Sequence, residues 1–232
     1  MEKVFMVNNL CKNIGNRKII KGLNLSLNKE KVLGILGPNG KGKTTLLNII
    51  SGIIKATSGE VLIDGIKVSC ETKKVVSFLQ EKNTLSSWMT IKDAINFYKD
   101  FFEDFDEEKV KELLKFMNLD EKLKIKTLSK GMLEKLNLSL TLSRKVKLYI
   151  LDEPISGVDI VSREKIISAI IDNIGEDSSM IITTHYVGEL EGVFDEVAFL
   201  DDGKIVEIND AEVLREKYGK SIEEIYKYIF AE

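Results

Sequence analysis

The chain has 232 residues, of which 44% are hydrophobic and 31% charged, and this composition is that of an ordinary globular protein. Its length allows one large domain or two small ones with a sizeable core. The formal net charge of −3 gives no general attraction to nucleic acid or anionic lipid, so we expect no nucleic-acid partner. The sequence lacks an apolar run of about 18 residues, so we expect no membrane span. The first ten residues do not resemble a signal peptide.

The two cysteines, Cys11 and Cys70, do not have the spacing of a metal site. They could pair, but we expect two buried, reduced thiols in a cytosolic protein.

The first half of the chain predicts strands around one glycine-rich loop. Residues 23–28 alternate apolar and polar, which predicts a strand with one wet face. Residues 31–53 predict a buried strand, a glycine loop and a helix in succession. A short strand is expected at 59–65 and a buried strand at 75–79.

The second half begins with a mostly helical block from Thr90 to about Arg144. A buried strand at 147–154, a helix at 163–174 and an apolar strand at 180–184 follow. Residues 197–208 predict a hairpin that turns at Asp202 and Gly203. Two helices close the chain, and the last one, at 221–230, places an apolar face on Ile222, Ile225, Tyr226 and Ile229. Alternating strands and helices predict an α/β fold with a mainly parallel sheet and an inserted helical lobe.

The loop GPNGKGKT at 37–44 has the phosphate-binding pattern G-x-x-x-x-G-K-[ST]. A strand precedes it and a helix follows, which is the context that the pattern requires. Glycines let backbone N–H groups surround phosphate oxygens, Lys43 reaches the β- and γ-phosphates, and the Thr44 hydroxyl can bind Mg²⁺.

Four further polar residues follow buried strands and are expected at the same sheet edge. Asp152 can hold Mg²⁺, and Glu153 can polarise an attacking water. His185, the only histidine, can hydrogen-bond a terminal phosphate or that water. Gln80 can touch Mg²⁺ or orient water, but its position alone does not distinguish these roles from that of a surface residue.

The stretch LSKGM at 128–132 precedes a helix-like segment. Ser129 is a good N-cap, and no acidic residue follows in the first positions. A helix start with free N–H groups, Gly131 and a lysine is suited to an anion. The residues alone do not identify that anion.

The motifs GPNGKGKTT, FLQ, LSKGM, YILDEP, SGVD and TTH, in this order, resemble the ATP-binding cassette family of transporter ATPases over about residues 3–220. The resemblance implies ATP and Mg²⁺ as cofactors. It implies Glu153, His185, Gln80 and Lys43 as catalytic residues and Thr44, Gln80 and Asp152 as metal ligands. Nucleotide contacts are implied for Gly37, Asn39, Gly40, Gly42, Lys43, Thr44, Thr45, Ser129, Gly131, Asp159 and Ile14. Ser129 and Gly131 would bind the γ-phosphate of ATP held by another subunit, with Asp159 at the dimer interface.

The sequence departs from the family pattern in three places. Lys130 and Met132 stand where glycine and glutamine are usual, and Lys41 stands at a usually small, neutral position of the phosphate loop. Ile14 stands where an aromatic residue usually stacks on adenine, and Phe5 is the available substitute. We therefore expect weak discrimination between ATP and GTP.

The family fold implies a P-loop, RecA-like α/β core at 1–87 and 146–220 with an N-terminal antiparallel β subdomain. A helical subdomain at 88–145 and a C-terminal helix at 221–232 complete a single nucleotide-binding domain, 1–232. The expected partners are a second copy or a paralogous ATPase, and a membrane permease subunit that docks on the helical subdomain near Gln80. The expected location is peripheral, at the cytoplasmic face of the membrane.

An exporter is favoured over an importer because no large regulatory domain follows residue 220. The sequence most resembles small Gram-positive exporter ATPases, including those for phenol-soluble modulins, so amphipathic or antimicrobial peptides are the expected cargo. The alternative is a soluble ATPase of DNA repair or regulation, but the long coiled coil of the repair type is missing. A GTPase would need an Asn-Lys-x-Asp element, which we do not find.

Overall fold

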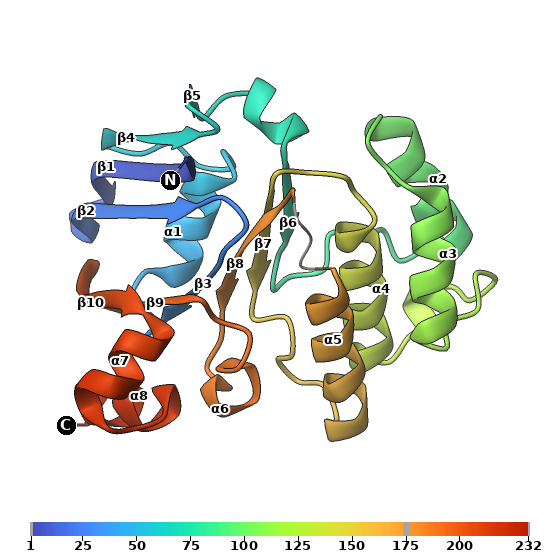
Figure 1. Ribbon diagram of the computed structural model, residues 1–232. Coiled ribbons are helices and arrows are strands. Elements are labelled where there is room, and N and C mark those ends of the chain that lie inside the picture. The colour runs from blue at the N-terminus through green and yellow to red at the C-terminus, as the bar shows by residue number, and fades with distance from the viewer. Residues whose placement is uncertain (1, 174–176, 232) are drawn as a thin grey trace.

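The computed structural model describes residues 2–173 and 177–231, which form two β-sheets and the helices around them (Figure 1). Within these residues, the larger sheet has six strands in the order β10-β9-β3-β8-β7-β6. Its strands run parallel from β9 to β6, and β10 is antiparallel to β9. The smaller sheet is antiparallel, with the order β2-β1-β4-β5. The α/β fold with an N-terminal antiparallel sheet is therefore confirmed.

The strands are β1 Lys3–Ile14, β2 Arg17–Asn28, β3 Val32–Leu36, β4 Ser58–Ile63, β5 Ile66–Lys67, β6 Val76–Leu79, β7 Leu148–Asp152, β8 Ser179–Thr183, β9 Glu196–Asp201 and β10 Lys204–Asp210. The α-helices are α1 Lys43–Ile50, α2 Ile91–Phe101, α3 Glu107–Phe116, α4 Lys130–Leu142, α5 Ile160–Asp172, α6 Val187–Leu190, α7 Ala211–Tyr218 and α8 Ile222–Phe230. Two 3₁₀ turns, η1 Glu71–Lys74 and η2 Ile125–Thr127, complete the described elements. Residue 174, the last of the helix expected at 163–174, lies outside the described residues.

The central strands β3, β7 and β8 are buried along their whole length. Such strands are covered on both faces, which is why their sequences read as continuous apolar runs. One hydrophobic cluster combines residues of both sheets and of α1, among them Phe5 and Leu46. A second cluster lies on the opposite face of the large sheet, beneath the remaining helices.

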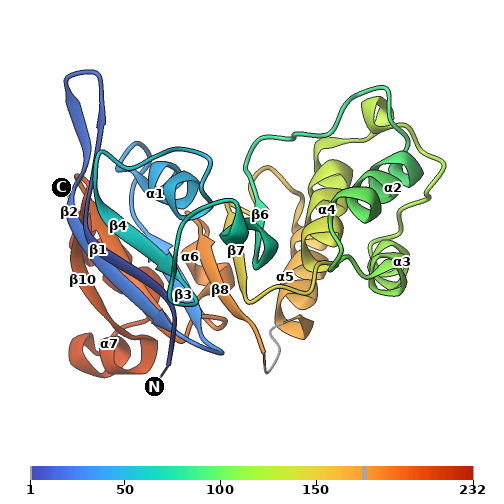
Figure 2. The ribbon, with the colours of Figure 1, turned by 90° about the horizontal axis from the view of Figure 1, so that it is seen from above.

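The long hairpin of β1 and β2 projects beyond the rest of the small sheet (Figure 2). Within this hairpin, sequence reasoning assigned strand structure explicitly only to residues 23–28. Leu23, Leu25 and Leu27 of that stretch are buried and alternate with more exposed residues, as predicted. The expectation of two buried thiols is wrong, because Cys70 is exposed and Cys11 is only half-buried; both are free.

The helical block forms α2, α3 and α4, on the side of the molecule away from the small sheet (Figure 2). The guanidinium of Arg144, which is 4% exposed, ties this block to the large sheet. It forms an ion pair with Asp104 at 2.9 Å and donates to the carbonyl oxygen of Val76 at 2.7 Å. At the chain's end, Ile222 and Ile225 are fully buried on one face of α8. None of the described helices is long and apolar enough to cross a membrane.

A candidate nucleoside triphosphate site

The loop between β3 and α1 has the backbone that an anion-binding turn requires. Gly40 and Gly42 have φ angles of 77° and 108°, in the region that favours glycine. A Cβ at Gly37 would lie 2.2 Å from the carbonyl oxygen of Leu200, so only glycine fits there. Helix α1 begins at Lys43 and has no acidic residue in its first turn. Its N–H groups and its dipole are therefore available to a phosphate.

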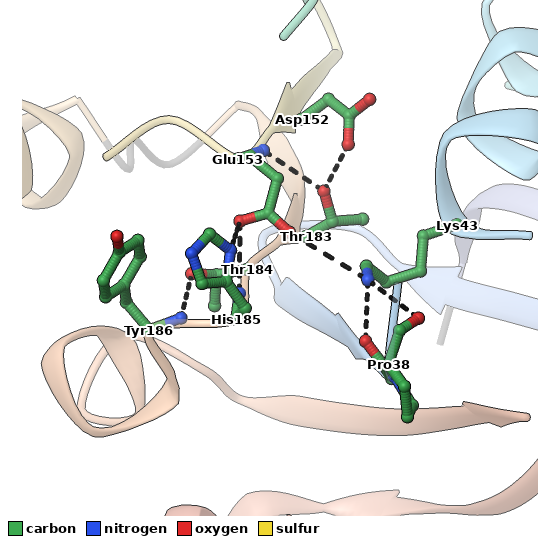
Figure 3. A network of polar contacts seen from close by, with 9 residues as sticks. Pro38, Lys43, Asp152, Glu153, Thr183, Thr184, His185 and Tyr186 are labelled. Atoms are coloured by element: carbon green, nitrogen blue, oxygen red, sulfur yellow. Dashed lines mark hydrogen bonds and ion pairs between the residues drawn. The ribbon is translucent and has the colours of Figure 1, made fainter. Parts of the chain in front are cut away.

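Lys43 lies between this loop and the end of β7 (Figure 3). Its Nζ donates to the carbonyl oxygens of Gly37 at 2.6 Å and Pro38 at 3.3 Å, and it lies 4.0 Å from Glu153 Oε1. Burial lowers the pKa of Lys43, and the nearby carboxylates oppose this effect. An anionic phosphate in the cavity would likewise favour the charged ammonium.

Asp152 ends β7 and is 1% exposed. Its Oδ1 accepts a hydrogen bond from Thr183 Oγ1 at 2.6 Å, whereas Oδ2 has no hydrogen-bond partner among the described residues. Burial raises the pKa of Asp152, and the hydroxyls of Thr183 and Thr44 oppose the rise. A buried carboxylate oxygen without a partner, close to a threonine hydroxyl, is a donor set that suits a hard cation such as Mg²⁺.

Glu153 follows in a left-handed conformation, with φ at 55°. This strained turn is supported by its backbone N–H, which donates to the carbonyl oxygen of Thr183 at 3.1 Å. The Oε2 atom accepts from the backbone N–H of His185 at 3.1 Å and lies 2.7 Å from His185 Nδ1 (Figure 3). A carboxylate and an imidazole in contact can hold and transfer the proton of an attacking water.

A cavity of about 420 Å³ joins these parts. The residues that line it are Ile19, Asn39, Gly40, Gly42, Lys43, Thr44, Thr45, Glu81, Glu153, Ser156 and His185. The structure thus brings together the phosphate loop, Glu153 and His185, with Asp152 directly behind them. Gln80 follows β6 and is half-buried next to the lining residue Glu81, but is not itself among the described lining residues.

The hairpin residue expected to contact adenine differs from the hairpin residue that lines the cavity. Ile14 is 56% exposed at the end of β1 and is not among the described residues that line the cavity. Ile19, on β2, lines it instead. The suggestion that Phe5 could stack on adenine is wrong, because Phe5 is 1% exposed and packs between the two sheets. Lys41 of the phosphate loop pairs with Asp201 at 2.8 Å.

The LSKGM segment lies at the start of α4, outside the described lining of the cavity. Ser129 is the N-cap, as predicted, and accepts from the backbone N–H of Met132 at 3.2 Å. No acidic residue lies in the first turn of α4. Asp159 caps α5 by accepting from the backbone N–H of Ser162 at 3.0 Å. The start of α4, predicted to bind an anion, is therefore not part of the described lining of the phosphate loop's cavity.

Sequence reasoning missed Thr183 and Glu81. Thr183 is the last residue of β8 and lies opposite Asp152 in the parallel pairing of β7 and β8. Its position at the end of a buried strand, like that of Asp152, could have indicated it. Glu81 directly follows Gln80, so its position just after β6 was the signal for it.

The fold and the phosphate-binding loop define a P-loop nucleoside triphosphatase. Residues 20–156, more than half of the chain, match the family model described as ABC transporter. The chain is 31% identical over 214 residues to the ABC transporter ATP-binding protein YtrB of Bacillus subtilis, covering 91% of this chain and 73% of YtrB. The chain therefore belongs to the ABC transporter family as an ATP-binding cassette, and it is an ATPase.

Other similar proteins and structures agree with this assignment. The linearmycin resistance ATP-binding protein LnrL of Bacillus subtilis is 30% identical, over 91% of this chain and 70% of LnrL. The lantibiotic transport ATP-binding protein SrtF of Streptococcus pyogenes is 29% identical, over 93% of this chain and 96% of SrtF. A solved ATP-binding subunit of an ABC transporter superimposes with a TM-score of 0.87 at 20% identity, covering 96% of this chain and 98% of that one.

Proposed function

We propose that the chain is the motor subunit of a membrane exporter, acting at the cytoplasmic face through a separate permease. The names of similar proteins support an exporter, since SrtF is a lantibiotic transport protein and LnrL a linearmycin resistance protein. Both names concern antimicrobial compounds, which favours amphipathic or antimicrobial peptides as cargo. The relatives named above give no support to the alternative of a soluble ATPase of DNA repair or regulation.

ATP binds with its phosphates on the loop that contains Gly37, Asn39, Gly40, Gly42, Lys43, Thr44 and Thr45. Thr44, Asp152 and Gln80 would hold Mg²⁺, which would supply positive charge to the phosphate oxygens. The orphaned Oδ2 of Asp152 supports this assignment. Adenine lies toward the hairpin, against Ile19, with Ile14 at its edge.

Glu153 orients the attacking water and accepts its proton, and His185 holds Glu153 in place and contacts the γ-phosphate. Glu153 is 8% exposed, faces the cavity and already accepts two contacts from His185. Its restricted position suits a general base, because a positioned base is more effective than a mobile one. Gln80 connects the cation to the helical subdomain, since it lies in the segment between β6 and α2.

The observation that carries the proposal is the separation between the phosphate loop and the start of α4, which we take as a second anion site. Ser129 and Gly131 lie outside the described lining of the phosphate cavity, yet their helix start has no acid in its first turn. A second copy, or a paralogous ATPase, placed head to tail would bring this helix start to the γ-phosphate of the first. ATP then stabilises the dimer because it binds better to the closed state than to the open one.

The permease docks on the helical subdomain close to Gln80. Trp88, in the segment after Gln80, is 70% exposed, and Phe101 of α2 is 68% exposed. Phe97 stacks on Phe101 with 4.4 Å between ring centroids and is itself 40% exposed. Aromatic side chains left in water on one subdomain are typical of a surface that another protein covers.

The mass of the Glu153→Gln variant in solution tests the proposal. We expect a dimer with ATP and Mg²⁺ and a monomer or weak dimer without nucleotide. A second change, Ser129→Arg, is expected to prevent the dimer while ATP binding to the monomer stays unchanged. ADP with Mg²⁺ is the matched nucleotide control.

A Glu153→Gln variant that stays monomeric with ATP at high concentration requires the same measurement with the permease bound. If the two ATPase subunits still do not associate there, the proposed head-to-tail dimer is wrong.

A further inference from the structure

The imidazole ring of His185 has one nitrogen committed to Glu153. Its Nδ1 lies 2.7 Å from Glu153 Oε2, and the side chain, which is 40% exposed, lines the phosphate cavity. A contact at one corner of a ring sets a distance but not an angle, so the ring can still turn about that corner. The direction of Nε2, the nitrogen left for a ligand in the cavity, therefore depends on what lies against the ring.

The phenol ring of Tyr186 lies against this imidazole (Figure 3). The two ring centroids are 4.0 Å apart and the ring planes meet at 42°. This is a close contact, since aromatic pairs usually have centroids about 4.5–7 Å apart. Consecutive side chains of a strand point to opposite faces, so neighbouring rings meet only where the backbone turns. Tyr186 makes that turn, because its φ of −94° and ψ of 62° belong neither to a strand nor to a helix.

Tyr186 is itself held in place from two sides. Its backbone N–H donates to Thr184 Oγ1 at 2.9 Å. The guanidinium of Arg163, on α5, lies over the phenol ring at 4.1 Å from its centroid, which is a cation–π contact. Arg163 in turn donates to Glu189 Oε1 at 2.6 Å and to the carbonyl oxygen of Val158 at 2.8 Å. The tyrosine ring therefore cannot move away from His185 without losing its contact with α5.

We propose that Tyr186 is a positioning residue for His185, whose ring it holds so that Nδ1 faces Glu153 while Nε2 faces the cavity. The inference rests on the proposed function, in which His185 contacts the γ-phosphate and holds Glu153. Tyr186 acts through His185 and is not among the described residues that line the cavity. Without the phenol ring, the imidazole takes orientations in which Nε2 no longer faces the γ-phosphate, and turnover falls.

ATPase kinetics of the full chain, in complex with its permease where the isolated chain is inactive, give the first test. Tyr186→Leu removes the ring, and Tyr186→Phe keeps the ring but removes the hydroxyl. Tyr228→Leu, which removes an exposed ring of α8 outside the described cavity lining, is the matched control. We expect Tyr186→Leu to lower kcat by about 3- to 30-fold with KM little changed, because the Nδ1 contact and the phosphate loop remain. Tyr186→Phe and the control keep the wild-type kcat.

The position of the ring can be measured without turnover. His185 is the only histidine of the chain, so its carbon–proton NMR signals are unambiguous in protein that carries no histidine tag. The order parameter of its Cδ2–H bond reports how tightly the ring is held. We expect a value near that of a rigid backbone, about 0.85, in the wild type and Tyr186→Phe, and a value below about 0.6 in Tyr186→Leu. If Tyr186→Leu has the wild-type order parameter, Tyr186 does not hold the ring and the inference is wrong.

A double-mutant cycle with His185→Ala identifies the route. If Tyr186 acts through His185, Tyr186→Leu has little further effect on kcat in the His185→Ala background. Additive effects overturn the inference, and so does a Tyr186→Phe variant as slow as Tyr186→Leu, because the hydroxyl rather than the ring would then matter. Thermal unfolding of each variant separates a loss of turnover from a loss of fold. If Tyr186→Leu does not fold, Tyr186→Met takes its place in every measurement.

His185→Ala alone tests the proposed function. If this variant keeps the wild-type turnover, the proposed role of His185 in hydrolysis is wrong, and the order parameter still decides whether Tyr186 holds the ring. If His185→Ala loses turnover while Tyr186→Leu keeps the wild-type kcat, only the role of Tyr186 is overturned.

Discussion

Glu134 of α4 is an acid whose burial makes the protein less stable as the pH rises. Glu134 is 9% exposed, and burial raises the pKa of its carboxyl group from 4.5 to about 7. Lys130 opposes this rise and Glu81 adds to it. The pKa of Glu134 is higher in the folded state than in the unfolded state. The contribution of this carboxyl group to stability is therefore complete below pH 4.5 and is lost as the pH rises through about 7.

The change Glu134→Gln removes the charge and keeps the shape. With pKa values of 4.5 unfolded and about 7 folded, the ionised carboxyl destabilises the wild type by about 3 kcal/mol at pH 8 and by about 1 kcal/mol at pH 5. We therefore expect the variant to be more stable than wild type at pH 8, by up to about 3 kcal/mol, with most of the gain gone at pH 5.

Urea unfolding at pH 5, 6, 7 and 8 measures this difference directly. Glu216→Gln, at an exposed position of α7, serves as the control and is expected to follow the wild type at every pH. If the wild type and Glu134→Gln differ by the same amount at pH 5 and pH 8, the carboxyl does not titrate in this range and the reasoning is refuted.

Four further predictions concern the nucleotide site. Glu153→Gln is expected to bind ATP but to hydrolyse it about 10² to 10⁴ times more slowly, and a turnover equal to wild type would remove Glu153 from the role of base. His185→Ala is likewise expected to lose turnover, whereas Lys43→Ala is expected to lose nucleotide affinity, as measured by equilibrium binding of a fluorescent ATP analogue. Because Ile19 can pack on a purine but reads no ring edge, ATP and GTP are expected to be hydrolysed at similar rates, and a preference above about a hundredfold would mean that another residue recognises adenine.

Much of the site could be predicted because parallel strands impose a shared geometry. Asp152 ends one buried apolar strand, Glu153 follows it, and His185 lies just after another. The carboxyl ends of parallel strands meet at one edge of a sheet. The glycine loop of residues 37–44 follows another strand of the same sheet, so a local pattern was sufficient to place it. The Ser129 N-cap was equally local, since capping depends only on neighbouring backbone N–H groups.

The remaining features depend on packing between distant segments. Ile19 reaches the cavity because β2 lies against the phosphate loop, where a Cβ on Gly42 would be 3.0 Å from Ile20 Cδ1. Nothing in the sequence near residue 19 indicates this neighbour. The pairing of Asp152 with Thr183 depends on the register of β7 and β8, which the sequences of the two strands do not specify separately. Phe5 could not be distinguished from an exposed aromatic until both sheets were placed.

Lys130 and Glu134 lie one turn apart on α4, and each is unfavourable when considered alone. The helix dipole disfavours the lysine at the first position, and burial disfavours the charge on the glutamate. Together they offset part of both costs, because an ammonium four residues before a carboxylate stabilises its ionised form. The remaining cost is still of the order of the energy calculated above, so the pair does not stabilise α4. What the lysine gains beyond this helix is its contact across Gly157, which joins the start of α4 to the turn that follows Glu153.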